Sequence, residues 1–459
     1  MAQTVVTNPS GGGSITRNGG AAPSVTDQTA TGGGVRVYDI TGNTPITVSG
    51  VTINQSVTGP TANALALEGS TAGSNNIGVT FSGTNAITSS VANGAALALT
   101  SNATSNAVIN AATTLQGKYG IDVIAGGASI LNAGTIKGTV NAAIYAAGGG
   151  TITNATGGAI TGGAGVGAVN LNGGGTFNNY GSVDSFGAAG SGASGVSSTG
   201  GDTFVNLYAG SVTGTVALGS GNDTLTIYTG RGTADVATTD TASGITLQSA
   251  GTKFMTNVGA IDLGGGNNTL VLAGNGDGTA AKGAAGSYQI GNASNVSVLH
   301  KTGSGIWTLN GAAGASMAGA TINAGDGGVP GSGGTLIFAN TTGLTGVINV
   351  NGTVIRALGA GAFGTGTINA IDPTIQYGST GTYANNIVLQ SVDTANDPTV
   401  LQTFGLGITA TLSGSITQAG SANQPLVFKS TDTSGNPLAG TFILTGNGSW
   451  LGTTTISAL

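Results

Sequence analysis

The side chains that could carry out chemistry in this chain are mainly aspartates. The sequence holds no cysteine, one histidine (His300) and one glutamate (Glu68) among its 16 acidic residues. Thiol chemistry, disulfides and histidine-based metal sites are therefore excluded. His300 has no acid or serine nucleophile motif near it in the sequence, so a histidine-dependent hydrolase is poorly supported. We interpret it as a histidine in a turn.

Two carboxylates that flank a groove could hydrolyse a glycosidic bond if they lay within several ångströms of each other. Stacked strands could produce such pairs from Asp223 and Asp262, or from Asp184 and Asp202. Most aspartates, however, stand beside Gly, Thr or Pro, where the side chain serves turn formation. We therefore predict no catalytic residues in this chain.

One segment resembles a calcium-binding unit. Gly219–Thr226 resembles the nonapeptide pattern G-G-x-G-x-D-x-U-x, in which calcium is shared between consecutive turns nine residues apart. The nearest similar segment lies 45 residues later, where Asn268 replaces Asp223. A glycine turn that ends a strand explains the segment better. We predict no metal site and no cofactor.

The composition sets the fold class in which such residues must be positioned. Of 459 residues 88 are glycine and only 6% are charged, so an extensive helical fold is excluded. An apolar fraction of 39% differs from the composition of disordered chains. A net charge of −6 with scattered cations argues against nucleic acid as a partner. A packed β protein with frequent turns remains.

Short segments of alternating apolar residues recur along the chain and predict strands. Pairs such as Asn93-Gly94 and Asn172-Gly173 separate them and supply the positive φ that tight turns require. The predicted strands include 35–38, 46–48, 65–67, 224–227, 269–272 and 387–389.

Internal repetition favours a solenoid over a sandwich. An element of two residues followed by Asn recurs as Val108-Ile109-Asn110, Ile130-Leu131-Asn132, Ile152-Thr153-Asn154 and Phe177-Asn178-Asn179. The asparagines lie 22, 22 and 25 residues apart, which suits one coil of a right-handed parallel β-helix. We predict an all-β solenoid of about 20 coils with apolar ladders inside. The asparagines are expected to stack as hydrogen-bonded amides.

A second recurring pattern is G-x-aromatic-x-L-x-G. It occurs at 305–311, with Trp307 and Leu309, and at 440–446, with Phe442 and Leu444. The aromatic residue and the leucine share one face of a strand, so both are expected in the core. Trp307 and Trp450 are expected to pack in the core or at an end, on equivalent strands.

The segment Lys301–Gly311, followed by Gly319–Gly325, resembles the autotransporter-associated β-strand repeat, and Gly440–Ile456 resembles a second copy. The resemblance identifies the chain as a passenger domain of a type V secretion protein. It implies export through the periplasm to the surface of a Gram-negative cell, or release from it. It also implies that the natural protein continues into an outer-membrane barrel. The absence of cysteine suits this route.

These patterns divide the chain into three predicted segments. Residues 1–60 are expected to cap the first strands, 61–299 to form a β-helix with irregular insertions, and 300–459 to form the β-helix that carries the repeats. No run of 18 or more apolar residues occurs, so we expect no membrane insertion of this segment.

The function expected from these features is non-enzymatic adhesion. A weakly charged flank rich in Thr, Ser and Asn lets two rods approach and associate along their length, or lets one rod attach to a host or abiotic surface or to a glycan. Two alternatives remain open. One is a β-helical enzyme acting on polysaccharide in a cleft formed by the insertions 185–200 or 228–245, and the other is a passive structural spacer.

Overall fold

The structure is a computed structural model of the chain. It describes residues 45–56, 63–69, 76–163, 166–185, 193–228, 238–248, 258–274, 293–311, 316–325, 334–390, 397–420, 423–432 and 435–457. It also describes the backbone of strands at 13–17, 24–26, 29–31, 35–39, 255–257 and 288–290.

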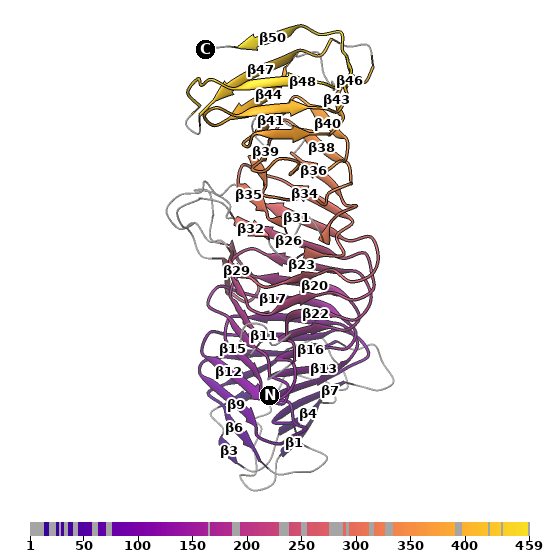
Figure 1. Cartoon of the computed structure of the whole chain (residues 1–459). Coiled ribbons are helices and arrows are strands. Elements are labelled where there is room, and N and C mark those ends of the chain that lie inside the picture. Colours follow the sequence, from indigo (N-terminus) through magenta and orange to yellow (C-terminus); the bar gives the residue numbers. More distant parts are fainter. Residues whose placement is uncertain are drawn as a thin grey trace. The chain divides into compact units, whose positions relative to one another are not determined.

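The chain forms two compact units. Unit 1 comprises Met1–Leu225 and Thr233–Gly266, and unit 2 comprises Thr226–Gly232 and Asn267–Leu459. In both units short strands pair in parallel with the strand one coil later in the chain (Figure 1). The prediction of an all-β parallel solenoid is confirmed. In the described part of the chain, no helix is long and apolar enough to span a membrane.

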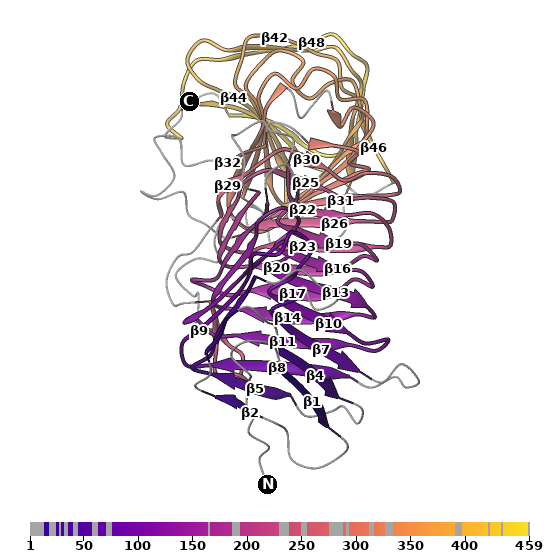
Figure 2. The ribbon, with the colours of Figure 1, turned by 90° about the horizontal axis from the view of Figure 1, so that it is seen from below.

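Unit 1 has three sheets, and each coil crosses them in the order I, II, III (Figure 2). Sheet I contains β1 (Gly13–Arg17), β4 (Val35–Asp39), β7 (Leu65–Gly69), β10 (Leu97–Thr100), β13 (Ile121–Ala125), β16 (Ile144–Ala146), β19 (Val169–Leu171), β22 (Ser194–Ser198), β25 (Thr215–Ala217) and β30 (Ile261–Asp262). Sheet II contains β2 (Ser24–Thr26), β5 (Ile46–Ser49), β8 (Ile77–Ser82), β11 (Ser105–Ile109), β14 (Ala128–Asn132), β17 (Gly150–Asn154), β20 (Gly175–Asn179) and β23 (Thr203–Leu207). Sheet III contains β3 (Thr29–Thr31), β6 (Thr52–Gln55), β9 (Asn85–Ser89), β12 (Thr113–Gly117), β15 (Thr135–Gly138), β18 (Ala159–Thr161), β21 (Ser182–Asp184), β24 (Gly210–Val212) and β29 (Met255–Val258).

Unit 2 has two long sheets and one short one. Sheet IV contains β31 (Thr269–Ala273), β34 (Val298–Lys301), β36 (Thr321–Ala324), β38 (Ile348–Asn351), β40 (Ile368–Ile371), β43 (Ile387–Gln390), β46 (Ile416–Gln418) and β49 (Gly448–Ser449). Sheet V contains β32 (Tyr288–Ile290), β35 (Ile306–Leu309), β37 (Thr335–Phe338), β39 (Val354–Ala357), β41 (Thr374–Tyr377), β44 (Thr399–Phe404), β47 (Leu426–Thr431) and β50 (Thr454–Ser457). Sheet VI contains β42 (Gly381–Tyr383), β45 (Thr409–Leu412) and β48 (Thr441–Leu444).

Four further strands complete the described elements. They are β26 (Thr224–Tyr228), the antiparallel pair β27 (Thr238–Thr239) and β28 (Thr246–Gln248), and β33 (Ala293–Ser294).

Alternation along each strand builds the core. Because successive side chains point to opposite faces, every second residue points inward and meets its register partner in the next coil. One inward column of sheet II is fully buried and consists of Val79, Ala107, Ile130, Ile152, Phe177 and Val205. Successive members are 22 to 28 residues apart, so the coil length varies around the expected interval.

Glycines enter sheet II where neighbouring coils approach closely. Gly150 has a φ of +124°, and a Cβ there would lie 2.1 Å from the carbonyl oxygen of Ala128 in the preceding coil. Gly175 repeats this arrangement one coil later, with a φ of +125° and the carbonyl oxygen of Gly150 at 2.2 Å from an added Cβ. The glycines that precede the recurring Asn element therefore allow one turn to stack on the next.

The asparagine ladder is confirmed for three of the four predicted members. Asn132 donates from Nδ2 to Asn154 Oδ1, and Asn154 donates from Nδ2 to Asn179 Oδ1, both at 2.9 Å. All three side chains are buried. The alignment of Asn110 with them was wrong by one residue, because Ile109 is the register partner of Asn132. The buried Ala107 and Ile109 fix that register, since a one-residue slip would turn them outward.

The two G-x-aromatic-x-L-x-G segments do not occupy equivalent strands. Trp307 and Leu309 lie in β35 of sheet V and are buried as expected. Phe442 and Leu444 lie in β48 of sheet VI, where Leu444 is 47% exposed. The prediction that both leucines enter the core was therefore wrong for the second copy. Trp450 follows β49 and is half-buried, so the two tryptophans are not on equivalent strands either.

The predicted segment boundaries at 60 and 300 stay a prediction. Much of 1–60 lies outside the described residues, although its strands β1, β2 and β3 already pair in parallel with β4, β5 and β6. The insertions predicted at 185–200 and 228–245 lie partly outside the described residues as well.

Candidate interaction surfaces

The outward face of sheet II carries no charged residue from β8 to β23. The burial pattern of each strand and the register between strands show which residues point inward and which point outward. Burial of the apolar column therefore also fixes which residues face outward. They are Thr80, Asn106, Val108, Ser129, Leu131, Thr151, Thr153, Thr176, Asn178, Phe204 and Asn206.

Part of this face is a hydrogen-bonded ladder. Asn206 donates from Nδ2 to Asn178 Oδ1 at 3.0 Å, and Asn178 donates from Nδ2 to Thr153 Oγ1 at 3.4 Å. The three residues are register partners on β17, β20 and β23. Their polar groups are thus held in a fixed row at the spacing of the coils, about 4.8 Å.

Unit 2 repeats the arrangement on the outward face of sheet IV. Asn369 donates to Asn349 Oδ1 at 2.8 Å, and Asn349 donates to Asn323 Oδ1 at 2.8 Å. His300, which we expected in a turn, lies instead in strand β34, where it is the next register partner in the same column and is partly exposed. The described outward residues of this sheet include no lysine, arginine or carboxylate.

The other faces of unit 1 carry charges. On sheet I, Asp122 is the register partner of Tyr145, whose ring centroid lies 5.7 Å from that of Tyr119. The Lys118 ammonium lies 5.5 Å from the Tyr119 ring centroid. Burial raises the pKa of Asp122 to about 6, and Lys118 opposes the shift. Lys137 and Asp184 lie on the outward face of sheet III. Sheet II is therefore the uncharged flank of unit 1.

The aspartates considered as catalytic carboxylates accept hydrogen bonds from residues of nearby turns and strands. Asp223 is buried, and its Oδ1 accepts a hydrogen bond from the backbone amide of Thr203 at 2.7 Å. Burial raises the pKa of Asp223, and the hydrogen bonds from Thr203 lower it. Asp202 Oδ1 accepts from the amide of Asn222 at 2.8 Å.

Asp262 and Asp184, the other two candidate carboxylates, also accept hydrogen bonds. Asp262 Oδ1 accepts from the amide of Gly264 at 3.1 Å, and Asp184 Oδ1 accepts from the hydroxyl of Thr213 at 2.6 Å. The segment 219–226 thus uses its aspartate to hold the neighbouring coil. Among the described residues, no three acidic or histidine side chains gather as metal ligands would.

Lys301, the first residue of the repeat motif, is fully buried, which the sequence pattern alone did not predict. Its Nζ donates to the carbonyl oxygens of Thr302, at 3.2 Å, and Gly303. The lysine therefore holds the turn between β34 and β35. A buried charge of this kind is stable only with such hydrogen bonds.

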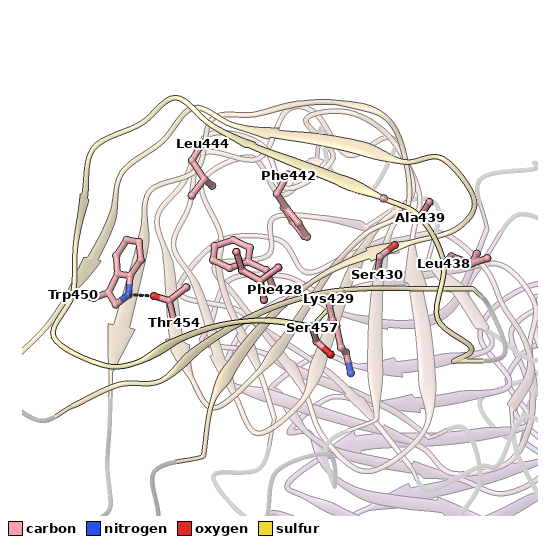
Figure 3. A pocket seen from close by; sticks show the side chains of 12 residues that line it. Phe428, Lys429, Ser430, Leu438, Ala439, Phe442, Leu444, Trp450, Thr454 and Ser457 are labelled. Atoms are coloured by element: carbon pink, nitrogen blue, oxygen red, sulfur yellow. Dashed lines mark hydrogen bonds between the residues drawn. The ribbon is translucent and has the colours of Figure 1, made fainter. Parts of the chain in front are cut away.

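A cavity of about 510 Å³ lies at the last coil of unit 2 (Figure 3). Its walls are mostly apolar and include Phe428, Phe442, Leu444 and Ile456. Trp450 stands at its side and donates from Nε1 to Thr454 Oγ1 at 3.0 Å. The polar contributions to the lining include Lys429 and Ser430 of β47. From the sequence, Phe442, Leu444 and Trp450 were expected to pack in the core or at an end, and no cavity was predicted.

Comparisons with known proteins add no family to this description. No family model, curated protein or solved structure matches the chain.

Proposed function

We propose that the chain is a non-enzymatic adhesin, displayed on or released from a Gram-negative cell as an autotransporter passenger, that associates with identical copies through its uncharged flanks. The observation that carries the proposal is the outward face of sheet II. From Thr80 to Asn206 it presents only neutral side chains, and three of them form a hydrogen-bonded row. Sheet IV presents a similar row in unit 2.

Uncharged surfaces that repeat similar groups at every coil favour side-by-side association. Two surfaces without charges approach without electrostatic cost, so dispersion and hydrogen bonds act at contact distance. Each contact is weak, but contacts at every coil act together once the first forms. Because no ion pair is involved, salt is expected to change this association little.

The roles that the described aspartates play in turns also support adhesion over catalysis. Asp202, Asp223 and Asp262 each accept a hydrogen bond from a backbone amide. A hydrogen bond that stabilises the charged form of a carboxylate lowers its pKa and so makes it a weaker base.

The proposal is tested by placing positive charges on the outward face of sheet II. Ser129 and Thr176 are outward residues of sheet II, two coils apart, and the double variant Ser129→Lys, Thr176→Lys would put like charges on both approaching surfaces. The matched control is Thr135→Lys, Ser182→Lys, which adds the same charge to the exposed face of sheet III, also two coils apart.

Sedimentation velocity and clumping of cells that display the chain are the measurements. We expect the sheet II variant to weaken association severalfold while the sheet III variant behaves as the parent does. Equal effects of the two variants, or clumping that disappears in moderate salt, would contradict the proposal.

A further inference from the structure

Arg356 is a cation held in a fixed position on the outward face of sheet V. In β39, Ile355 and Ala357 are buried, and Arg356 points to the opposite face. Its Nε donates to Oε1 of Gln376, the register partner in the next coil, at 2.6 Å. Its guanidinium carbon lies 3.8 Å from the centroid of the Phe404 ring. Stacking on the ring and the hydrogen bond from Nε together set the plane of the guanidinium.

The amides beside Arg356 are occupied by one another. Gln376 donates from Nε2 to Oε1 of its register partner Gln402 at 3.1 Å, and Gln402 donates from Nε2 to Thr431 Oγ1. Both glutamine side chains are buried. This row of hydrogen bonds positions Arg356 but supplies no negative charge to balance it.

Within the described residues, Arg356 has no counter-charge that acts on it. Burial lowers the pKa of Arg356, and no neighbouring charge contributes to that shift. Lys118 of unit 1 differs, because it interacts with the carboxylate of Asp122. Arg356 stays protonated, and a partly buried charge without a partner is costly. The bond to Gln376 uses one of five N–H groups, which leaves the two Nη atoms to bind an anion.

We propose that Arg356 binds the carboxylate of an acidic saccharide, such as a uronic acid, on the outward face of sheet V. A planar carboxylate accepts two parallel hydrogen bonds from a guanidinium and carries the single negative charge that one arginine balances. A phosphate dianion would keep an excess negative charge beside buried groups, so a carboxylate fits this site better.

The strands around Arg356 favour a compact ligand over a peptide. β39 pairs with β37 and β41, and β41 also pairs with β44, so β39 and β41 have no free edge to which a peptide strand could add. Leu358, directly after β39, is 48% exposed. A Cβ added at Gly378 would lie 3.5 Å from Leu358 Cδ2 and 3.8 Å from the carbonyl oxygen of Phe404, so Leu358 and Phe404 lie close together. An apolar side chain at this place suits the C–H groups of a sugar ring.

This site goes beyond the association of copies proposed above. The flank contact uses sheets II and IV, whereas Arg356 lies on sheet V. Loss of saccharide binding therefore leaves the flank contact intact, and the two proposals can fail separately.

Calorimetric titration of the whole chain with sodium glucuronate, glucose and inorganic phosphate is the first experiment. We expect glucuronate to bind about tenfold or more tightly than either of the other two, because only glucuronate presents both a carboxylate and a sugar ring.

The second experiment repeats the glucuronate titration with variants. Arg356→Gln should abolish binding, and Arg356→Lys should weaken it by about tenfold, because an ammonium keeps the charge but lacks the planar fork. The matched control is Lys137→Gln, which removes one positive charge from the outward face of sheet III and should bind as the parent does. Thermal unfolding checks that each variant is folded, and Arg356→Lys keeps the test valid if Arg356→Gln is not.

Four results would overturn the proposal. They are a parent chain that does not bind glucuronate, equal binding of inorganic phosphate, unchanged binding by Arg356→Lys, and a change in sedimentation of Arg356→Gln, which would assign Arg356 to the contact between copies. A capped Gly-Glu-Gly peptide that binds as tightly as glucuronate would also reject the saccharide, in favour of an acidic protein partner.

Discussion

Asn154 joins three coils of unit 1 from inside the core. It donates to Asn179 Oδ1 and accepts from Asn132 Nδ2, both at 2.9 Å, and its Nδ2 also lies 3.2 Å from the carbonyl oxygen of Ser182. The residue is fully buried, so each of these bonds is made away from water. Low local polarity strengthens such bonds and makes an unpaired group costly.

The first prediction follows from this arrangement. Asn154→Ala should lower the free energy of unfolding by about 2 kcal/mol or more, because it leaves the buried amides of Asn132 and Asn179 without their partner. Urea unfolding of the chain measures the loss. The control is Thr151→Ala, at an exposed outward position of the same strand, for which we expect a much smaller change. Similar losses from both changes would show that the ladder contributes little.

A second prediction concerns backbone packing between coils. Gly150→Ala should destabilise unit 1 by about 1–3 kcal/mol, because its φ of +124° is unfavourable for alanine and the new Cβ would meet the oxygen of Ala128. Gly265→Ala is the control, since no atom lies within 4 Å of a Cβ added there. Thermal unfolding compares them. An unaltered melting temperature for Gly150→Ala would mean that the coils can separate locally at little cost.

The third prediction is a pH dependence centred on Asp122. Burial raises its pKa in the folded chain to about 6, above that of the unfolded chain. The folded state therefore binds this proton more tightly, and its stabilising contribution is present below pH 4 and lost as the pH rises through about 6. Asp122→Asn should remove that fall and stabilise the protein at pH 7.5 by on the order of 1 kcal/mol, since the carboxyl group is only partly buried.

Chemical unfolding at a series of pH values between 4 and 7.5 measures this effect. The parent and Asp122→Asn should differ at the upper end of the range and converge at the lower end. Parallel curves for the two chains would assign the pH dependence to other groups.

The fourth prediction uses the two tryptophans as a matched pair. Trp307 is 1% exposed, so Trp307→Ala should cost about 3–5 kcal/mol of stability. Trp450 is half-buried beside the cavity, and Trp450→Ala should cost markedly less. Fluorescence of the single-tryptophan variants adds a direct readout, with Trp307 emitting at the shorter wavelength. The reverse order of emission would place Trp307 outside the core.

The sequence by itself determined the architecture of the chain. Glycine-rich turns, alternating apolar residues and an interval near 22 residues predicted a parallel solenoid, because those patterns are local and each repeat must stack to bury its apolar face. Val79, Ala107 and Ile130 show the outcome as one buried column. The buried asparagines 132, 154 and 179 were identified in the same way.

Only the tertiary structure decided the register, and with it which face each residue occupies. Asn110 matches the sequence repeat, yet the coil places Ile109 opposite Asn132, because burying Ala107 and Ile109 outweighs the match of one asparagine. The burial of Lys301 likewise depends on which residues of the neighbouring coils lie against it. Contacts between coils join residues some twenty positions apart, so no local pattern specifies them, and packing across the whole solenoid selects them.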